Sequence, residues 1–357
     1  MKSNRVVHIG PSVSARGGIA RVIRGLLDSP LAEEYELTSV STVSQHTGSV
    51  RLMAFPLAIA RLTWMFIISK PAAVHVHTAS WGSFPRKRLV VGLAHLFGVP
   101  VILHIHGGAF ARYLQQRSSR EQAVRRTLQR CCVVIALSEQ LKERLLALVP
   151  DADIRVIPNS VDIPVSPAHN TSSAHMIFVG RPVSEKGIYE LLDAMSGIVE
   201  QYPAATLEIA GNDEGGGLAS RLRDLALEGN VRMCGWLGSA ALHEAYSRSS
   251  IFVLPSHIEA MPVSLLEAMS YGLACVATPV GAVPDIITDG DNGIIIPVND
   301  SRALTAALKT LLADEQLRFD LGEHARATII AHYSLARTAD LIGGVYAVCG
   351  VKKGRAG

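Results

Sequence analysis

Residues 251–272 read IFVLPSHIEAMPVSLLEAMSYG, and they change from a strand pattern to a helix pattern across one short loop. The apolar run has the length of a buried strand and stops at Pro255-Ser256. Pro262 suits the first turn of a helix, and Gly272 suits the position just after its end. A strand, a loop and a helix in this order predict one repeat of a parallel sheet that is covered by helices.

The same alternation runs along the chain in two arrays. Strands are expected in the first array at 6–10, 36–41, 73–78, 101–107, 133–138 and 154–159, and in the second at 176–180, 205–211, 231–236, 251–256, 274–279 and 293–298. The Pro- and Ser-rich segment 162–175 predicts a linker between them. Helices alone are expected at 300–313, 315–332 and 334–348. The sequence therefore predicts an α/β protein with two doubly wound, Rossmann-like domains that face a central cleft.

Composition excludes several classes of protein. The 357 residues are 48% hydrophobic and 18% charged, which suits two buried cores and excludes disordered and collagen-like chains. The five cysteines lack the spacing of a disulfide framework or a zinc site. The apolar run near the N-terminus is too short for a signal peptide, and segment 51–70 is interrupted by Pro56 and Arg61, so no spanning helix is expected. These features predict a cytoplasmic protein.

Charge is distributed unevenly between the two arrays. Up to residue 165 the chain holds 20 Lys and Arg against 10 Asp and Glu, a net charge of +10, and the rest holds 14 against 21, a net charge of −7. A basic first half indicates an acidic partner, such as an anionic membrane surface or a phosphorylated substrate. No nucleic-acid-binding motif accompanies this charge, so nucleic acid is not an expected partner.

The loop and helix of 251–272 carry candidate binding residues. The backbone around Met261, Pro262 and Val263 lies at the expected helix N-terminus, where phosphate groups bind. Glu267, inside the helix, is placed to reach ribose hydroxyls beyond that phosphate, and Glu259 is placed to accept hydrogen bonds from other hydroxyls. Taken alone, such a pair of glutamates is more typical of a solvated surface.

A second cluster of charged residues, in 176–195, favours the interpretation that these side chains bind a ligand over the interpretation that they are solvated surface residues. A strand leads to Arg181, and Lys186 and Gly187 stand at the start of the next helix. Two cations and a helix N-terminus at the carboxyl end of a strand suit a diphosphate. Alone these cations are typical of a surface, but beside the glutamates we favour a binding role.

The first array carries weaker signals. Gly17-Gly18 opens a helix, but the full dinucleotide pattern G-x-G-x-x-G is missing, so a nicotinamide cofactor is not indicated. His104 and His106 lie on one side of a strand by period-two alternation. His106, at the strand's carboxyl end, is a candidate ligand-binding residue, and His104 is expected to be a core histidine with satisfied hydrogen bonds.

Together these motifs resemble the retaining nucleotide-sugar glycosyltransferases of the GT-B fold, glycosyltransferase family 4, over essentially the whole chain. The matching features are a Glu-x7-Glu motif at Glu259 and Glu267, a phosphate-binding pair at Arg181 and Lys186, a Gly-Gly loop at Gly17-Gly18, a cleft histidine at His106, and a Pro-Asn-x-Val-Asp segment at 158–162 that contains Asn159. The resemblance implies an acceptor-binding domain over 1–165, a nucleotide-sugar-binding domain over 166–330, and a C-terminal helix in 331–357 that packs back on the first domain.

The resemblance also implies a reaction and a role for each residue. The reaction is transfer of a sugar from a nucleotide-diphosphate donor with retention of anomeric configuration, without a metal or other cofactor. The resemblance implies that Arg181 and Lys186 stabilise the departing diphosphate and that Glu267 binds the ribose. It implies that Glu259 binds sugar hydroxyls and the cationic sugar, and that His106 contacts the donor sugar from the opposite domain. The other residues implied in substrate binding are the backbone of Cys234, Gly235 and Trp236, which contacts the base, and Gly17, Gly18, Met261, Pro262, Val263 and Asn159.

Segment 51–70 has two interpretations. It carries apolar side chains with basic residues near them, and the run Arg86-Lys87-Arg88 follows a strand. The apolar side chains concerned are Leu52, Phe55, Leu62, Trp64, Met65 and Phe66. One interpretation is a helix at an anionic membrane, with a lipid-linked acceptor and a peripheral location at the inner face of the plasma membrane. The other is a helix buried against the sheet, since parallel sheets require apolar helices.

Three functions follow. The principal hypothesis is a glycosyltransferase of surface or exported polysaccharide synthesis that acts on a lipid-linked or saccharide acceptor. A nucleotide-sugar 2-epimerase of the same architecture and a non-catalytic sugar-nucleotide or lipid-binding module are the alternatives. Their behaviour toward the donor alone separates them, because an epimerase interconverts it, a transferase hydrolyses it slowly at most, and a binding module leaves it unchanged.

Overall fold

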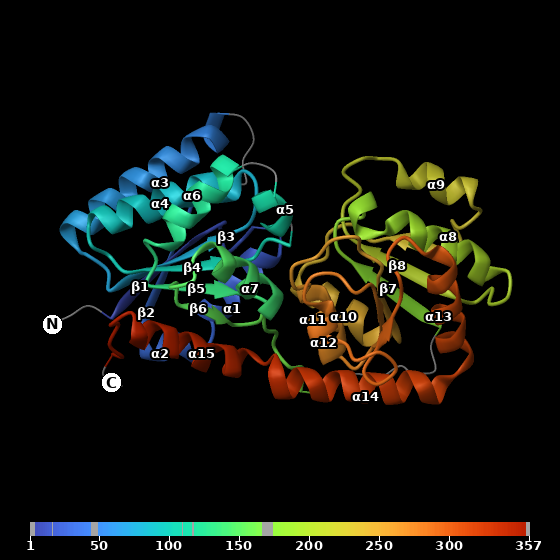
Figure 1. Cartoon of the computed structure of the whole chain (residues 1–357). Helices are drawn as coiled ribbons and strands as arrows, with labels where there is room; N and C mark the ends of the chain where they lie inside the picture. The colour runs from blue at the N-terminus through green and yellow to red at the C-terminus, as the bar shows by residue number, and fades with distance from the viewer. Residues whose placement is uncertain are drawn as a thin grey trace. The chain divides into compact units, whose positions relative to one another are not determined.

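A computed structural model describes residues 4–15, 17–43, 49–108, 110–115, 118–165 and 174–354. The chain divides into two compact units, which we call unit 1 (Met1–Ser160 with Leu335–Gly357) and unit 2 (Val161–Ser334) (Figure 1). Most of the linker expected at 162–175 lies outside the described residues.

Unit 1 contains a parallel six-stranded sheet in the order β2-β1-β3-β4-β5-β6. Its strands are β1 (Arg5–Gly10), β2 (Glu36–Ser41), β3 (Ala73–Thr78), β4 (Val101–Ile105), β5 (Val133–Ala136) and β6 (Ile154–Val156). Its helices are α1 (Gly18–Leu27), α2 (Leu31–Glu34), α3 (Ser49–Ile68), α4 (Ser83–Leu96), α5 (Phe110–Gln115), α6 (Ser118–Leu128), α7 (Glu139–Leu148) and α15 (Leu335–Val348).

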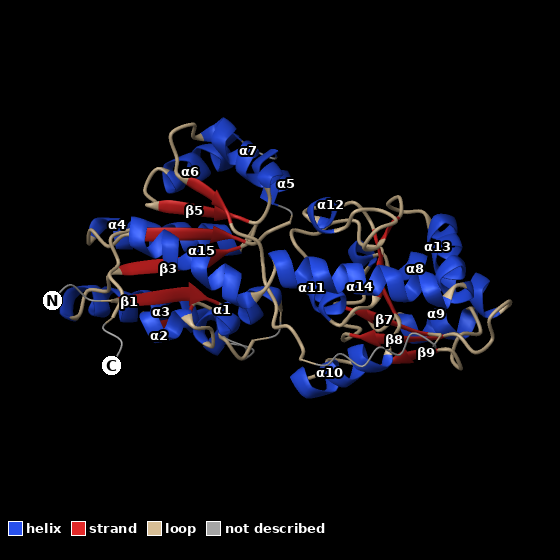
Figure 2. Cartoon of the chain, turned by 90° about the horizontal axis from the view of Figure 1, so that it is seen from below, coloured by secondary structure: helices blue, strands red, loops and turns tan. Residues whose placement is uncertain are grey.

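Both faces of this sheet are buried, because alternate residues of each strand enter different cores. Val7 and Ile9 belong to a core that α3, α4, α6 and α7 complete. Val6 belongs to a second core, which includes residues of α1, α2 and α15. Figure 2 shows the strands of β1, β3 and β5 with helices around them. In the second core, the rings of Tyr35 and Tyr346 meet edge to face at 5.2 Å, which fixes α15 on unit 1.

Unit 2 repeats the architecture with a parallel sheet in the order β12-β11-β10-β7-β8-β9. Its strands are β7 (His175–Val179), β8 (Thr206–Ala210), β9 (Val231–Met233), β10 (Ile251–Leu254), β11 (Ala274–Ala277) and β12 (Ile294–Ile295). Its helices are α8 (Ile188–Val199), α9 (Leu218–Asp224), α10 (Ser239–Arg248), α11 (Val263–Ser270), α12 (Val283–Ile286), α13 (Ser301–Ala313) and α14 (Glu315–His332), and a 3₁₀ turn covers Ser184–Lys186.

The expected fold class is confirmed. Each expected strand forms, although several end earlier than expected, so that 101–107 stops at Ile105 and 293–298 is reduced to Ile294–Ile295. The three expected C-terminal helices form as α13, α14 and α15. Asp300 and Asp314 cap α13 and α14, each accepting a hydrogen bond from a backbone N–H of the first turn.

Helix α3 divides the apolar side chains of segment 51–70 between core and solvent. Leu62 and Phe66 are buried in the first core of unit 1, and Phe55 and Met65 pack partly against it. Among the described side chains of the expected membrane-facing set, Trp64 alone is exposed, at 67% of its surface, because helical periodicity turns one side toward the sheet. The side chains of Arg51 and Leu52 lie outside the described residues. Among the described residues, no helix combines the length and apolar character that a bilayer-spanning segment needs.

The basic run 86–88 is also divided, and the expectation that Lys87 belongs to a basic surface is wrong. Arg86 and Arg88 are exposed, but Lys87 is only 3% exposed and its ammonium donates to the hydroxyl of Thr42. Burial, and to a lesser extent Arg86, lowers the pKa of Lys87 to about 7. Position 87 lies three residues after the buried Phe84, on the helix side that faces the core.

Candidate functional site

The carboxyl ends of β7 and β10 bring Lys186 and Glu259 together. Lys186 Nζ donates to Glu259 Oε1 at 2.5 Å, and their side chains are 24% and 10% exposed. Ser256, the second residue after β10, donates to the same carboxylate oxygen at 2.8 Å. An ammonium group has three hydrogens, so Lys186 can bind Glu259 and an incoming anion together.

The turn that carries Lys186 depends on Gly187. This residue has a φ of +67°, and a Cβ in its place would overlap the carbonyl oxygen of Pro255 at the end of β10. The chain there can approach the end of β10 only without a side chain. His257 N donates to the Glu185 carbonyl at 2.9 Å and ties the two loops further.

Gly187→Ala should therefore be strongly destabilising. Both the positive φ and the overlap with backbone oppose a side chain, so we expect the free energy of unfolding to fall by about 2 kcal/mol or more. Gly217→Ala is the matched control, because Gly217 has a φ of −94° and no atom within 4 Å of an added Cβ. Urea unfolding of both variants measures the difference, and equal stabilities would contradict this account of the turn.

The loop that carries Glu259 is fixed from a third strand. Thr278, after β11, donates its hydroxyl hydrogen to the Ser256 carbonyl, and Ala282 N donates to the Ala260 carbonyl at 2.7 Å. Gly281, with a φ of +61°, passes so close to the backbone of Glu259 that a Cβ would overlap it. The Glu259 carboxylate is thus held by three neighbouring strands, which is typical of a preorganised site.

Helix α11 begins directly after this loop. Pro262 is its N-cap residue and has no side-chain cap, Met261 and Pro262 are buried, and Val263 is half-buried. Inside the helix, Glu267 Oε2 accepts a hydrogen bond from the hydroxyl of Tyr246 on α10 at 3.0 Å. Sequence reasoning missed Tyr246, Ser256 and Thr278, and only their proximity to strand ends and to the Glu-x7-Glu segment could have indicated them.

The remaining site residues of unit 2 lie in other loops at strand ends. Arg181 follows β7 by two residues and is exposed. Cys234, Gly235 and Trp236 follow β9, and Trp236 N donates to Asn212 Oδ1 at 2.9 Å, which links this loop to the one after β8. Gly235 has a φ of +63°, so the loop turns back sharply there.

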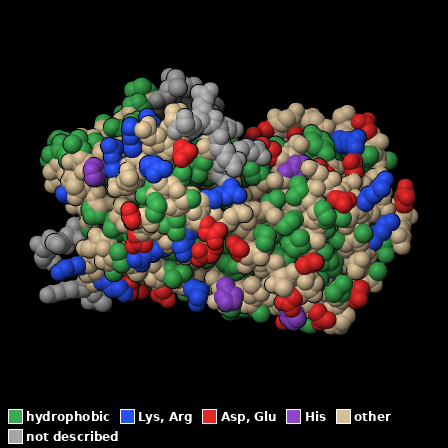
Figure 3. All heavy atoms as spheres, in the orientation of Figure 1, with side chains coloured by type: hydrophobic (Ala, Val, Ile, Leu, Met, Phe, Trp, Pro, Cys, Tyr) green, Lys and Arg blue, Asp and Glu red, His purple; other side chains and the backbone are tan. Residues whose placement is uncertain are grey.

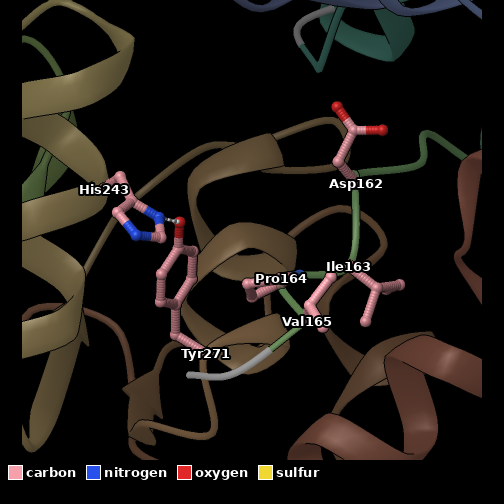
Figure 4. A pocket seen from close by; sticks show the side chains of 6 residues that line it. All are labelled: Asp162, Ile163, Pro164, Val165, His243 and Tyr271. Carbon is pink, nitrogen blue, oxygen red and sulfur yellow. Dashed lines mark hydrogen bonds between the residues drawn. The ribbon is translucent and has the colours of Figure 1, made fainter. Parts of the chain in front are cut away.

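A pocket of about 420 Å³ lies elsewhere in unit 2, between the segment Asp162–Val165 and the pair His243 and Tyr271. Figure 4 shows His243 and the Tyr271 hydroxyl joined by a hydrogen bond on one side of it. None of the residues expected at the site line this pocket.

In unit 1, the expected site residues fall in two places. His106 directly follows β4, and its Nε2 lies 3.0 Å from His77 Nδ1. Burial lowers the pKa of His106 to about 3, and a side-chain hydrogen bond with Asn159, itself only 5% exposed, raises it in part. Gly17, with a φ of +123°, is the N-cap of α1, which begins at Gly18.

His104 departs from the expectation of a satisfied core histidine. Its Nδ1 lies 3.3 Å from His75 Nε2, but its Nε2 is buried without a hydrogen-bond partner. Among the described residues, His8, His75 and His77 form one group with ring nitrogens within 4.8 Å, and His77, His104 and His106 form another. Histidine nitrogens at this spacing could hold a transition metal. Most of these nitrogens are already hydrogen-bonded to another histidine of the two groups.

Comparisons with known proteins point to one family. The profile of Glycosyl transferases group 1 matches residues 161–328, and that of Glycosyltransferase Family 4 matches residues 5–164. The phosphatidyl-myo-inositol mannosyltransferase of Mycolicibacterium smegmatis is 32% identical over 190 residues. That stretch covers 51% of this chain and 48% of the relative, so the match spans about half of each protein.

Solved structures share the fold across the whole chain. Sucrose-phosphate synthase from Thermosynechococcus elongatus is similar with a TM-score of 0.82 at 19% identity, covering 96% of this chain and 98% of that one. HepE from Anabaena in complex with UDP-glucose has a TM-score of 0.77 at 16% identity, covering 96% and 99%. With the GT-B fold in common and the two profiles spanning residues 5–328 between them, the chain belongs to the group 1, family 4 glycosyltransferases.

Proposed function

We propose that the chain transfers a sugar from a UDP- or GDP-sugar, with retention of anomeric configuration, to a lipid-linked or saccharide acceptor in surface or exopolysaccharide synthesis. The observation that carries this proposal is the contact between Lys186 and Glu259 beside the N-terminus of α11. A cation, a carboxylate and a helix N-terminus in one place suit the diphosphate and the hydroxyls of a nucleotide-sugar. Unit 2 then binds the donor, and unit 1 binds the acceptor.

The diphosphate is the leaving group, so its growing negative charge must be stabilised. We assign this role to Lys186, to Arg181 and to the backbone amides near Val263. Preorganised donors of this kind stabilise charge that develops in the transition state without reorganising at that moment. They supply the electrostatic stabilisation that a metal ion provides elsewhere, and we therefore propose transfer that needs no metal.

The remaining groups of unit 2 orient the donor. Glu259 accepts hydrogen bonds from sugar hydroxyls, and its charge stabilises the cationic sugar. Glu267 binds the ribose, using the carboxylate that now accepts from Tyr246. The base lies against the backbone of Cys234–Trp236, in the loop that Asn212 holds. Met261 and Pro262 complete the loop around the phosphates.

Unit 1 contributes three elements to the proposal. His106 contacts the donor sugar, and Asn159, whose side chain raises the pKa of His106, contributes to substrate binding beside it. At the Gly17-Gly18 turn, where Gly17 has a φ of +123° and no atom within 4 Å of an added Cβ, a substrate can approach the start of α1 closely.

Retention follows from displacement on one face of the sugar. The bond between the anomeric carbon and the diphosphate oxygen breaks with its electron pair leaving on that oxygen, and a short-lived ion pair forms. The acceptor hydroxyl oxygen then bonds to the anomeric carbon from the same face, and its proton passes to the departing phosphate oxygen. Glu259 acts here through charge and hydrogen bonds, not as a nucleophile.

Two relatives support the donor and acceptor classes. HepE from Anabaena forms a complex with UDP-glucose, which supports a nucleotide-sugar donor. The Mycolicibacterium relative is named as a mannosyltransferase of phosphatidyl-myo-inositol, which supports a lipid-linked acceptor.

The surface of unit 1 over α3 and α4 supports a membrane-bound acceptor. Among the side chains that the structure describes, the large exposed apolar residues of α3 include Met53, Leu57, Trp64, Ile67 and Ile68, and those of α4 include Leu89 and Leu96. Arg61, Arg86 and Arg88 are exposed on the same two helices. Figure 3 shows apolar and basic side chains interspersed over this part of the molecule. Apolar side chains among cations suit an interface with anionic lipid, and we propose peripheral binding at the inner face of the plasma membrane.

Binding to vesicles tests this surface. Leu57→Glu together with Trp64→Glu should weaken binding to phosphatidylglycerol-containing vesicles, measured by sedimentation, by about a hundredfold or more, since burial of each apolar side chain is worth about 1.5–3 kcal/mol. Phe319→Glu with Ile330→Glu, two exposed apolar residues of α14 in unit 2, is the matched control. Equal binding by both double variants would contradict the proposed membrane surface.

The reaction itself is tested with UDP- and GDP-sugars followed by proton NMR, with and without EDTA and candidate acceptors. The proposal predicts acceptor-dependent turnover of one donor, a product with the donor's anomeric configuration, and rates unaffected by EDTA. Interconversion of the donor without an acceptor would establish the epimerase instead, and an inverted product would exclude the retaining mechanism.

A further inference from the structure

A row of histidines crosses the sheet of unit 1 beneath α15. Strand register pairs His8 with His75 and His77 with His104, and these side chains enter the face that α1 and α15 cover. All four are at most 1% exposed, and His106 continues the row just after β4. Neighbouring ring centroids are 3.9 to 5.4 Å apart. We call these five residues the histidine row.

Tyr346 of α15 joins the histidine row into one hydrogen-bonded chain. The contacts are His106 Nε2 with His77 Nδ1 at 3.0 Å, His77 Nε2 with His8 Nδ1 at 3.0 Å, His8 Nε2 with the Tyr346 hydroxyl at 3.1 Å, the Tyr346 hydroxyl with His75 Nδ1 at 3.0 Å, and His75 Nε2 with His104 Nδ1 at 3.3 Å. Burial lowers the pKa of every histidine in the row, so each ring is neutral near pH 7.

Because the rings are neutral, all hydrogen bonds of the histidine row must run in the same direction. Each neutral imidazole has one N–H donor and one bare acceptor nitrogen, so the direction of one bond fixes the next. The Tyr346 hydroxyl has a single hydrogen for its two neighbours. If it donates to His8, all five rings carry their hydrogen on Nδ1, and if it donates to His75, all five carry it on Nε2.

The unpaired end of the chain favours the first direction. His104 Nε2 has no hydrogen-bond partner, and a bare acceptor nitrogen is more readily left unpaired in a protein core than an N–H group. His104 therefore carries its hydrogen on Nδ1, which donates to His75 Nε2. At the other end, His106 Nε2 faces His77, so the first direction leaves Nδ1–H as the donor of His106.

We propose that Tyr346 is a positioning residue that fixes the tautomer of His106 through His8 and His77. The Tyr346 hydroxyl donates to His8 Nε2, His8 Nδ1–H donates to His77 Nε2, and His77 Nδ1–H donates to His106 Nε2. His106 is left with Nδ1–H as its single donor, which a hydroxyl oxygen of the donor sugar accepts. This inference rests on the proposed contact of His106 with the sugar.

The tautomers can be observed directly in the unmodified chain by nitrogen-15 NMR of histidine-labelled protein at pH 7.5. The proposal predicts Nδ1–H tautomers for all five residues of the histidine row. An Nε2–H tautomer at His8, His77 or His106 would overturn it. Stoichiometric transition metal retained by the purified protein would overturn it too, because metal ligation breaks the chain of hydrogen bonds.

Two matched tyrosine variants test the effect on catalysis. Tyr346→Phe removes the hydroxyl that sets the direction, so His106 should populate both tautomers and kcat should fall about tenfold, with KM for the donor within about twofold. Tyr35→Phe removes the hydroxyl of the neighbouring buried ring, which faces the Gly343 carbonyl at 3.5 Å and not the histidine row. Its kcat should stay at the unmodified value.

The outcomes separate this inference from the proposed function. An active unmodified chain with equal kcat in the two variants, or an unchanged His106 tautomer in Tyr346→Phe, would overturn the role of Tyr346 and leave the transferase proposal intact. Absence of any transfer by the unmodified chain counts against the proposed function, and the NMR spectrum then decides the tautomer of His106 by itself.

Discussion

Replacing Lys186 by alanine is expected to lower kcat by about a hundredfold, equivalent to about 3 kcal/mol of transition-state stabilisation. Lys186 touches Glu259 beside the N-terminus of α11, where the proposed diphosphate gathers charge as it departs. That charge is larger in the transition state than in the bound donor, so the loss should fall on kcat more than on KM. Arg181→Ala should show a loss of the same kind.

A control separates this loss from a change in stability. Lys309 on α13 is a half-buried lysine of the same unit, and Lys309→Ala should leave kcat unchanged. Because the alanine at 186 leaves Glu259 without its cation, urea unfolding of each variant should accompany the kinetics. Unchanged turnover in both Lys186→Ala and Arg181→Ala would show that the diphosphate binds elsewhere.

Mild acid is expected to unfold unit 1. Burial lowers the pKa of all five residues of the histidine row from 6.5, to about 3 for His8 and His106. Above about pH 6.5 the rings are neutral in the folded and the unfolded chain alike, and below it the unfolded chain binds protons first. Stability therefore falls as pH drops from about 6.5 toward the folded-state values.

The expected loss is large compared with the stability of a domain. At about pH 5.5 each such histidine costs about 1 kcal/mol, so the five residues of the row together cost on the order of 5 kcal/mol, which approaches the total stability of many domains. We expect unit 1 to unfold between about pH 6 and pH 5.

Tryptophan fluorescence measures the two units separately. Trp64 and Trp81 lie in unit 1 and Trp236 lies in unit 2, and these are the chain's three tryptophans. In Trp236→Phe the two remaining tryptophans report on unit 1. In the double variant Trp64→Phe with Trp81→Phe, the remaining Trp236 reports on unit 2. Unit 1 should lose its signal at the higher pH. A unit 1 that stays folded at pH 5 would contradict the neutral, buried state of the histidine row.

The sequence predicts the fold well because its strands are short apolar runs between glycine and proline signals. Short runs rich in Val and Ile locate each strand, and Arg181, Lys186 and Glu259 are expected in loops because they follow such runs in the chain. The contact between Lys186 and Glu259 was not predicted, since it depends on the close approach of Gly187 to Pro255, which only the folded backbone reveals.

The burial of Lys87 and the histidine row could not be predicted from the sequence, for physical reasons. Lys87 stands between two arginines and has the appearance of a surface cation, but helical spacing from Phe84 places it in the core. The histidine row depends on strand order and register, which pair His8 with His75 and His77 with His104. Neither order nor register can be obtained from one strand's own sequence, and Tyr346 reaches the row only because α15 packs on unit 1.

Titration calorimetry with UDP, GDP and their sugar conjugates tests the central claim most directly, since the donor site in unit 2 is the basis of the proposed reaction. We predict one site per chain for one nucleotide family, with binding weakened by Lys186→Ala and unaffected by Lys309→Ala. At a nucleotide concentration of a hundred times Kd, binding should stabilise the chain by about 2.7 kcal/mol, which raises its thermal unfolding temperature. Absence of binding by every nucleotide diphosphate, or equal binding by the two variants, would contradict the account.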